Sequence, residues 1–389
     1  MTHVKKEVIP VKPNKILFCA TMDIHFKAFH LPQMEWFRQH NWEVHTAANG
    51  VMDLPFVNKS YNIPIQRSPL RMDNLKAYRK LRSIIENNQY DIIHCHTPLG
   101  GVLGRLAARK ARKNGTKVIY TAHGFHFCEG TPLMNWLIYY PIEKGLARLT
   151  DCLITINEED YAMAVRNKFS AKRIERVHGV GVNTERYKPA NILGQIDLRS
   201  QYGYESNDFL MFYAAEFNRN KNHKLLIHAL ALMKEEAIST KLLLAGVGPL
   251  LEECRQLAFQ LEVENMVQFL GYRDDIAQIL PMCDVAVSSS IREGLPVNIM
   301  EAMACALPIV ATRNRGHKEL IEDQVNGFVV HPDNVYMFAE RLLKLKRSKD
   351  LRQAMGLENL RRVRSYSLTE VGQELRDIYL LMGNKGGIA

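Results

Sequence analysis

The feature that most constrains the fold of this sequence is a regular alternation of short apolar runs with longer helix-like stretches. Five runs lie in the first half and five in the second, at residues 15–20, 43–48, 91–96, 117–123 and 152–157, and at 209–215, 241–246, 267–271, 285–290 and 308–312. Their near-continuous apolar character is typical of parallel strands that are buried on both faces. Strands that alternate with helices predict an α/β fold, here two doubly wound, Rossmann-like domains.

The division into two domains follows from the chain length and from one irregular segment. At 389 residues the chain exceeds what one hydrophobic core usually serves. Residues 178–190, HGVGVNTERYKPA, follow neither the strand nor the helix period, so we expect the linker there. The predicted domains are residues 1–188 and 189–367, and we expect a last helix, at about 368–389, to pack back on the first domain. Because such sheets bind ligands beyond the carboxyl ends of their strands, the sequence predicts a site in the cleft between the domains.

The positive charge of the chain is concentrated in its first half. Residues 1–190 contain 28 Lys and Arg against 16 Asp and Glu, whereas residues 191–389 contain 23 against 25. Such an excess predicts an anionic partner on that side, and a membrane leaflet, nucleic acid and phosphorylated lipid all qualify by charge. The sequence has neither a recognised nucleic-acid-binding fold nor a base-stacking platform, so we expect no nucleic-acid partner.

Two patterns in the first half favour an anionic membrane surface as that partner. The spacing of Arg105, Arg109 and Arg112 predicts one basic stripe on a helix, and an aromatic segment, LMNWLIYYPI, follows at 133–142. Basic stripes beside amphipathic aromatic residues suit an anionic membrane. The alternative is an ordinary solvated helix face.

The location of the protein is predicted from what the sequence lacks. No apolar run approaches the roughly 20 residues needed to span a bilayer, and the first 15 residues have no apolar core of a secretory signal. The seven cysteines are scattered singly, which is typical of reduced thiols. We therefore expect a cytoplasmic protein that is bound peripherally to the inner face of the cell membrane.

The segment REGLPVNIMEAMA, residues 292–304, combines several features of a ligand site. Pro296 suits the first turn of a helix, whose free N–H groups can bind phosphate. Gly294 allows close approach of the backbone, and Glu293 lies just outside the helix. Glu301 lies inside the helix among apolar residues, where a carboxylate requires partners. Those partners are either the hydroxyl groups of a ligand or an arginine from elsewhere in the fold.

The same stretch carries a resemblance to a known family. SIREGLPVNIMEAMACALPIVAT (290–312) resembles the E-x7-E signature of retaining glycosyltransferases of family 4, and FLGYRDDIAQILPMCDV (269–285) and ELIEDQVNGFVV (319–330) resemble the flanking segments. The resemblance extends over essentially the whole chain. Within the family, bacterial exopolysaccharide and capsule glycosyltransferases are most similar to three segments of the first half: HTPLGGVLGRLAARK, YTAHGFHF and NWLIYYPIEKGLARLTDCLITINEEDY. The resemblance implies the GT-B fold, in which an acceptor-binding and a nucleotide-sugar-binding Rossmann-like domain face a central cleft.

The resemblance assigns the donor site to the second half of the chain. Glu301 would bind the ribose hydroxyls of a nucleoside-diphosphate sugar and Glu293 the hydroxyls of the transferred sugar. The other positions implied for the donor are the backbone of Leu295, Pro296 and Val297 at the β-phosphate, with Gly294 allowing close approach, the backbone of Tyr272 and Arg273 at the base, usually uracil, and Lys221 at the diphosphate. Glu216 stands where many members have an arginine, and we expect Arg219 to replace that cation.

No metal or other cofactor is expected, and the UDP-sugar is the donor substrate. Lysine and arginine can balance the charge of a departing diphosphate, and no Asp-x-Asp metal motif occurs in the chain. In the first half the resemblance places His123 beside the donor sugar as a catalytic group, and Asp23 and His25 on the acceptor side. His126 could form a metal pair with His123, but the remaining ligands are missing at recognisable spacing.

The expected function is transfer of a sugar from a UDP-sugar, with an N-acetylhexosamine or a hexose as the sugar. The acceptor would be a lipid-linked (polyprenyl-diphosphate) saccharide or a growing polysaccharide in exopolysaccharide or capsule synthesis. Two alternatives stay open. One is a non-catalytic nucleotide-sugar-binding partner with the same fold. The other is an NAD(P)-dependent oxidoreductase, for which Gly246 and Gly248 offer an incomplete glycine motif.

Overall fold

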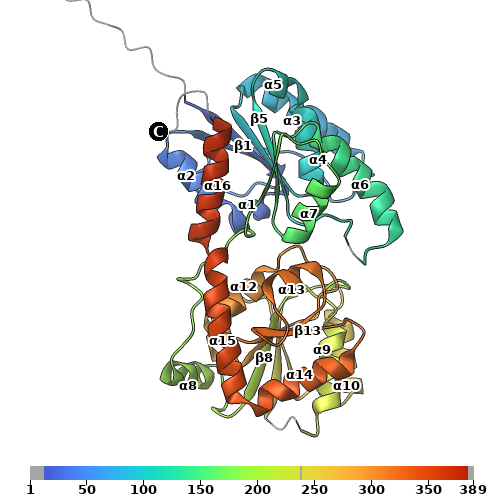
Figure 1. The fold of residues 1–389 in the computed structure, drawn as a ribbon, viewed down its shortest axis with the longest axis vertical. Coiled ribbons are helices and arrows are strands. Elements are labelled where there is room, and N and C mark those ends of the chain that lie inside the picture. The colour runs from blue at the N-terminus through green and yellow to red at the C-terminus, as the bar shows by residue number, and fades with distance from the viewer. Residues whose placement is uncertain (1–12, 129, 237–238, 384–389) are drawn as a thin grey trace, which may run out of the picture.

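A computed structural model describes residues 13–128, 130–236 and 239–383 of the chain (Figure 1). Residues 1–12, where no secretory signal was expected, lie outside the described residues. The same holds for residues 384–389, at the end of the expected last helix. No described helix is both long enough and apolar enough to pass through a bilayer.

The first half forms a sheet of seven parallel strands in the order β3-β2-β1-β4-β5-β6-β7. Its strands are β1 (Lys15–Met22), β2 (Glu43–Asn49), β3 (Lys59–Asn62), β4 (Ile92–His96), β5 (Lys117–Ala122), β6 (Cys152–Thr155) and β7 (Arg173–Arg176). Helices α1 (Ile24–Phe29), α2 (Leu31–Gln39), α3 (Asp73–Asn88), α4 (Pro98–Ala107), α5 (Arg109–Lys113), α6 (Leu133–Ala147) and α7 (Glu158–Arg166) surround it.

The second half forms a sheet of six parallel strands in the order β10-β9-β8-β11-β12-β13. Its strands are β8 (Phe209–Ala214), β9 (Thr240–Ala245), β10 (Val267–Gly271), β11 (Val285–Ser288), β12 (Ile309–Thr312) and β13 (Gly327–Val330). Its helices are α8 (Ile192–Gln201), α9 (His223–Met233), α10 (Leu251–Gln260), α11 (Ile276–Ile279), α12 (Val297–Ala304), α13 (Arg315–Leu320), α14 (Val335–Arg347) and α15 (Lys349–Val363). Both sheets follow the doubly wound order 3-2-1-4-5-6.

The ten predicted strands are confirmed, and three further strands were missed. The missed strands β3, β7 and β13 lie at the edges of their sheets. An edge strand is buried less completely than a central one, so β3 (KSYN) and β7 (RIER) lack an apolar run. All seven cysteines are free and buried, as expected of reduced thiols.

The chain crosses between the two halves twice, at neighbouring positions. The linker runs past the start of α16 (Leu368–Gly383), where Val182 exchanges backbone hydrogen bonds with Tyr366 and Leu368. Helix α16 then packs against α2 of the first half (Figure 1). The Tyr379 hydroxyl lies 2.8 Å from Nδ1 of His94 on β4. The linker and the last helix therefore form one double crossing between the domains.

The prediction that three arginines form one exposed basic stripe is wrong for Arg105 and Arg112. Arg105 is 1% exposed, lies over the ring of Tyr120 and donates to Glu143 at 2.8 Å. Arg112 donates to Asp151 through Nε at 2.9 Å. Helix α4 ends at Ala107, before Arg109 begins α5, so the helical spacing does not hold across the three positions. Buried acids thus bind two arginines that the spacing assigned to the surface.

Candidate active site between the two sheets

At the carboxyl edge of the second sheet, the loop after β8 is hydrogen-bonded to the loop after β11. The loop after β8 places the Asn220 carbonyl 2.7 Å from the Ile291 N–H, and the Asn220 side chain donates to the Arg292 carbonyl at 3.0 Å. The Ser289 hydroxyl donates to the Lys221 carbonyl at 2.7 Å. These bonds hold the lysine loop against the segment that carries Glu293.

Lys221 and Glu293 form an ion pair in this position. The lysine Nζ lies 2.5 Å from Oε1 of Glu293, and the side chains are 23% and 14% exposed. Partial burial strengthens the attraction, because the effective dielectric constant is lower than in water. The pair places one cation and one carboxylate directly before α12.

Helix α12 begins at Val297, with Pro296 in the N-cap position. The first N–H groups of a helix have no partner within it, so they are available to a phosphate. Leu295 and Pro296 are buried, while Gly294 and Val297 are half-buried. The backbone positions assigned to the β-phosphate therefore lie next to the Lys221–Glu293 pair in sequence and in space.

Glu301 lies on the second turn of α12, against the linker. Burial raises the pKa of its carboxyl group to about 7, and the Tyr187 hydroxyl and the charge of Arg186 oppose this rise. Among the described residues no ion pair to Glu301 is found. In the described part of the chain Glu301 is therefore not locked to an arginine: its hydrogen-bond partner is the Tyr187 hydroxyl, and Arg186 acts on it through its charge alone.

The other donor-side residues are exposed or engaged with neighbours. Tyr272 is 80% exposed after β10, and Arg273 forms an ion pair with Asp275. Arg219 is exposed on the same loop as Lys221. The structure therefore brings Lys221 and Glu293 into contact, whereas the side chains of Tyr272 and Arg219 extend into solvent.

His123 follows β5 in the first half and lies in a group of histidine rings. The ring centroids of His25 and His123 are 4.8 Å apart, and Nδ1 of His96 lies 3.4 Å from Nε2 of His123. Burial lowers the pKa of His25 to about 4 and holds that of His123 well below its usual value. These rings are therefore neutral near pH 7.

Asp23, predicted on the acceptor side, has a structural partner. Its Oδ2 accepts a hydrogen bond from the Met52 N–H at 2.8 Å, and its N–H donates to the Asn49 carbonyl. The carboxylate therefore holds the loop after β2 beside the start of α1. His25, two residues later, lines a large apolar cavity of the first half.

Arg315 connects the two halves of the protein at this site. Its guanidinium donates to the Asp160 carboxylate at 2.6 Å, to the Phe125 carbonyl at 2.7 Å and to the Glu293 carbonyl at 3.0 Å. The side chains of Arg315 and Asp160 are 8% and 0% exposed. Burial raises the pKa of Asp160, and the charge of Arg315 opposes that rise. One buried cation thus binds the loop after His123 and the loop that contains Glu293.

Gly294 and Gly124 meet across the same contact. A Cβ atom added to Gly294 would lie 2.1 Å from the His123 carbonyl oxygen. Gly124 has a φ of +128°, which residues with side chains rarely adopt, and its own Cβ would meet Arg315 and Gly294. Asn157 adds a hydrogen bond of 3.2 Å to the Gly294 carbonyl. Glycine is therefore required for the two halves to come this close.

Sequence reasoning missed Arg315, Asp160, Asn157 and Tyr187. Asn157 could have been found, because an asparagine followed by three acidic residues is typical of a helix N-cap, and it caps α7. Arg315 carries no such signal, since its three partners come from three separate segments. Tyr187 lies in the linker, where the sequence shows no periodicity.

Comparison with known proteins identifies the family. Residues 195–361 match the family described as glycosyl transferases group 1, and residues 15–157 match the family described as glycosyl transferase 4-like. The chain is 50% identical over 366 residues to the "Putative glycosyltransferase EpsD" of Bacillus subtilis (strain 168), covering 94% of this chain and 96% of that protein. This chain is a glycosyltransferase of that family. The oxidoreductase alternative is thereby excluded.

More distant relatives agree with this assignment. The glycosyltransferase is 25% identical over 313 residues to a UDP-Gal:alpha-D-GlcNAc-diphosphoundecaprenol alpha-1,3-galactosyltransferase of Escherichia coli, covering 79% of this chain and 80% of that one. Its fold matches Anabaena Alr3699/HepE, crystallised with UDP, at a TM-score of 0.75 and 21% identity over 94% of this chain and 100% of that one. The two parallel sheets and this match confirm the predicted GT-B fold.

Proposed function

We propose that the protein is a retaining enzyme that transfers a hexose or N-acetylhexosamine from a UDP-sugar to a lipid-linked saccharide. The observation that carries this proposal is the Lys221–Glu293 pair before α12, fastened by Arg315 to the loop of His123. A diphosphate needs a cation and helix N–H groups, and a reacting sugar needs groups from the opposite domain. Both requirements are met within one cleft.

In the proposed reaction, the bond between the anomeric carbon and the β-phosphate oxygen breaks while the acceptor oxygen bonds to that carbon on the same face. The acceptor proton passes to the departing diphosphate. Lys221, Arg219 and the start of α12 stabilise the diphosphate charge without a metal ion, while Glu301 accepts hydrogen bonds from the ribose. Glu293 and His123 hold the sugar. Closure of the two halves excludes water, so that the acceptor reacts in preference to water.

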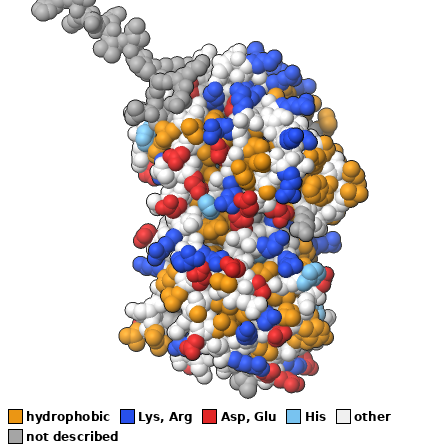
Figure 2. Space-filling model, viewed as in Figure 1, with side chains coloured by type: hydrophobic (Ala, Val, Ile, Leu, Met, Phe, Trp, Pro, Cys, Tyr) orange, Lys and Arg blue, Asp and Glu red, His pale blue; other side chains and the backbone are white. Residues whose placement is uncertain are grey.

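The acceptor proposal is supported by the apolar surface of the first half. A cavity of about 830 Å³ extends from His25 and Phe125 to Ile138 and Ile142 on α6. The same helix exposes several large apolar side chains, namely Leu133, Met134, Leu137, Ile138 and Ile142. Hydrophobic side chains gather on this projecting part of the molecule (Figure 2). An apolar cavity that opens beside the cleft suits the lipid of a polyprenyl-diphosphate acceptor, in keeping with the substrate in the name of the E. coli relative.

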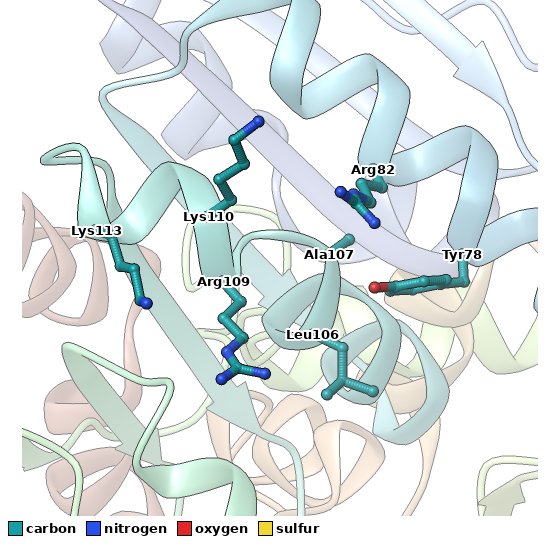
Figure 3. Close-up of a pocket in the computed structure, with 7 residues that line it drawn as sticks. All are labelled: Tyr78, Arg82, Leu106, Ala107, Arg109, Lys110 and Lys113. Carbon is teal, nitrogen blue, oxygen red and sulfur yellow. The ribbon is translucent and has the colours of Figure 1, made fainter.

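An anionic membrane surface is proposed as the second partner of this half. Arg82, Arg109, Lys110 and Lys113 line a pocket between α3 and α5, beside Tyr78 (Figure 3). Lys and Arg side chains also dominate this end of the molecule in Figure 2. A basic surface near exposed apolar residues favours peripheral binding to anionic lipid on the inner face of the cell membrane. A role in exopolysaccharide or capsule synthesis agrees with another relative, the capsular polysaccharide biosynthesis glycosyltransferase CapM of Staphylococcus aureus.

The test is a panel of UDP- and GDP-sugars, assayed for donor hydrolysis and then for transfer to a polyprenyl-diphosphate sugar. We expect a UDP-sugar to be the best donor and the product to keep the anomeric configuration of the donor, as read by NMR. Glu293→Gln should retain UDP affinity and reduce transfer by about a hundredfold or more, whereas Glu264→Gln, at an exposed position of the same half, should do neither. Binding without hydrolysis or transfer would instead support the non-catalytic partner.

A further inference from the structure

Four histidines from three neighbouring loops of the first half converge below the cleft. His25 lies on α1, His30 lies between α1 and α2, His96 ends β4, and His123 follows β5. One ring nitrogen of each lies within 4.8 Å of those of the other three. Strands β1, β4 and β5 are adjacent in the sheet, so their carboxyl ends bring these loops together.

The hydrogen bonding of these rings is incomplete. Nε2 of His25, His30 and His96 is buried and has no hydrogen-bond partner among the described residues. His94, two positions before His96 on the same strand, provides a contrast, because its two nitrogens lie 2.8 Å from the Tyr379 and Thr121 hydroxyls. Buried polar atoms in native proteins almost always have a partner. Three unpartnered nitrogens in one cluster therefore indicate a shared ligand.

The chemistry of the cluster selects the class of ligand. Neutral imidazoles present lone pairs to their surroundings, and imidazole is the preferred ligand of zinc and its neighbours among the transition metals. Phe18 packs against the rings of His30 and His96, so the far side of the cluster is apolar. We propose that His25, His30, His96 and His123 bind one divalent transition-metal ion, with Zn²⁺ favoured by the all-nitrogen ligand set.

The exposure of the four residues provides a route for the ion. His30 and His96 are 4% and 1% exposed, whereas His25 and His123 are half-buried, and His25 lines the large apolar cavity. A tetrahedral zinc site has metal–nitrogen distances of about 2.0–2.1 Å, so modest inward rotation of the rings would complete it. The ion would fix α1 and the loop of His123 to the strand ends. His123 would bind the ion through Nε2, which faces His96, and keep its Nδ1–H for the sugar, while Lys221 is proposed to balance the diphosphate charge.

The experiment measures metal binding directly on the full chain, purified through a tag without histidine. After chelation and dialysis, the protein is titrated with Zn²⁺ in competition with a chromogenic chelator, and with Co²⁺ while visible absorption is recorded. We expect about one ion per chain and the intense absorption of tetrahedral Co²⁺. Thermal unfolding should shift upward with Zn²⁺ and downward with chelator.

Variants assign the site to these residues. His30→Ala and His96→Ala should each abolish stoichiometric binding, while His126→Ala, at an exposed histidine of the same loop as His123, should retain it. If a variant fails to fold, the Co²⁺ spectrum of the wild-type chain still decides the question. Absence of stoichiometric binding to the wild-type chain, or equal binding by wild type and His96→Ala, would overturn the proposal.

Discussion

The two sheets of this glycosyltransferase have the same strand order, yet the groups at their carboxyl ends differ in kind. The second half presents ionised groups, a lysine and a glutamate in direct contact before a helix. The first half presents neutral histidine rings beside an apolar cavity, although it carries all the net positive charge of the chain. Four of its basic side chains, Arg82, Arg109, Lys110 and Lys113, line a pocket between the outer helices α3 and α5.

Under the proposed function, this difference lets one architecture serve two kinds of ligand. Charge at the strand ends suits a small, highly charged nucleotide, whereas charge on the outer helices beside an apolar cavity suits an amphipathic ligand at a surface. The two surfaces act together only when the two halves are in contact at the loops of His123 and Glu293. Arg315 and the close approach of Gly124 to Gly294 provide that contact.

The largest expected effect comes from breaking this connection with Arg315→Ala. Removal of the guanidinium leaves the buried Asp160 without its cation, and loss of one partner of a buried ion pair typically costs about 3–5 kcal/mol. We expect the free energy of unfolding to fall by that amount in denaturant titrations and transfer to fall strongly. Arg313→Ala removes an exposed arginine two residues away and should change neither. Equal stability of the two variants would show that the halves do not depend on this contact.

The ten strands with apolar runs were predictable, and the segment 292–304 stood out in the sequence, because the causes of both are local. Buried parallel strands have continuous apolar runs, and the segment around Glu293 and Glu301 keeps its pattern within thirteen residues. Arg315 and the histidine cluster were not predictable, because each depends on segments that only the fold brings together. The metal partner that sequence spacing suggested for His123 was His126, which is not a member of the cluster. Arg105 looked exposed because its partner Glu143 lies 38 residues away.

The second effect tests how closely the halves must approach. Gly294→Ala places a methyl group where the His123 carbonyl oxygen lies, so the two loops must separate. A displacement of about 1 Å at a reacting centre can lower the rate by about a hundredfold. We expect a loss of that order in transfer, measured with saturating donor so that a change in UDP affinity does not contribute. Gly145→Ala, on α6 with no atom within 4 Å of the added methyl, should keep wild-type transfer.

The third effect concerns the ionisation of the Glu301 carboxyl group in the second half. Because burial raises the pKa of Glu301 to about 7, the free protein carries this carboxyl group largely protonated below that pH. Ribose hydroxyls donate to the ionised form, so affinity for a UDP-sugar should rise with pH up to about 7, by about tenfold per unit in the acidic limb. Isothermal titration at pH 5.5–8 measures this, with a UDP-sugar chosen because its diphosphate does not titrate there.

Glu301→Gln is the control for that pH dependence. The amide cannot ionise, so affinity should be weak and independent of pH over the same range. In the wild-type protein without ligand, the folding stability should change with pH in the opposite direction to the affinity. The folded state keeps a proton that the unfolded state releases between its ordinary pKa of 4.5 and about 7, so stability should decrease as pH rises through that window. A flat affinity profile for the wild-type protein would contradict the assignment of Glu301 to the ribose.

The smallest expected effect compares membrane binding by the surfaces of the two halves, through one exposed leucine on each. Leu137 on α6 is 61% exposed, and Leu193 on α8 of the second half is 72% exposed. If α6 lies in the interface of an anionic membrane, Leu137→Ser should weaken binding to anionic phospholipid vesicles by about fivefold, roughly the loss of 1 kcal/mol from a partly inserted leucine. Leu193→Ser should leave vesicle binding unchanged, and neither substitution should alter thermal unfolding, since both side chains are exposed.

Co-sedimentation at low and moderate salt measures the effect, and equal losses from the two variants would mean that apolar exposure on α6 has no special relation to lipid. A loss confined to Leu137→Ser would locate the membrane surface on the half that carries the apolar cavity and the basic helices.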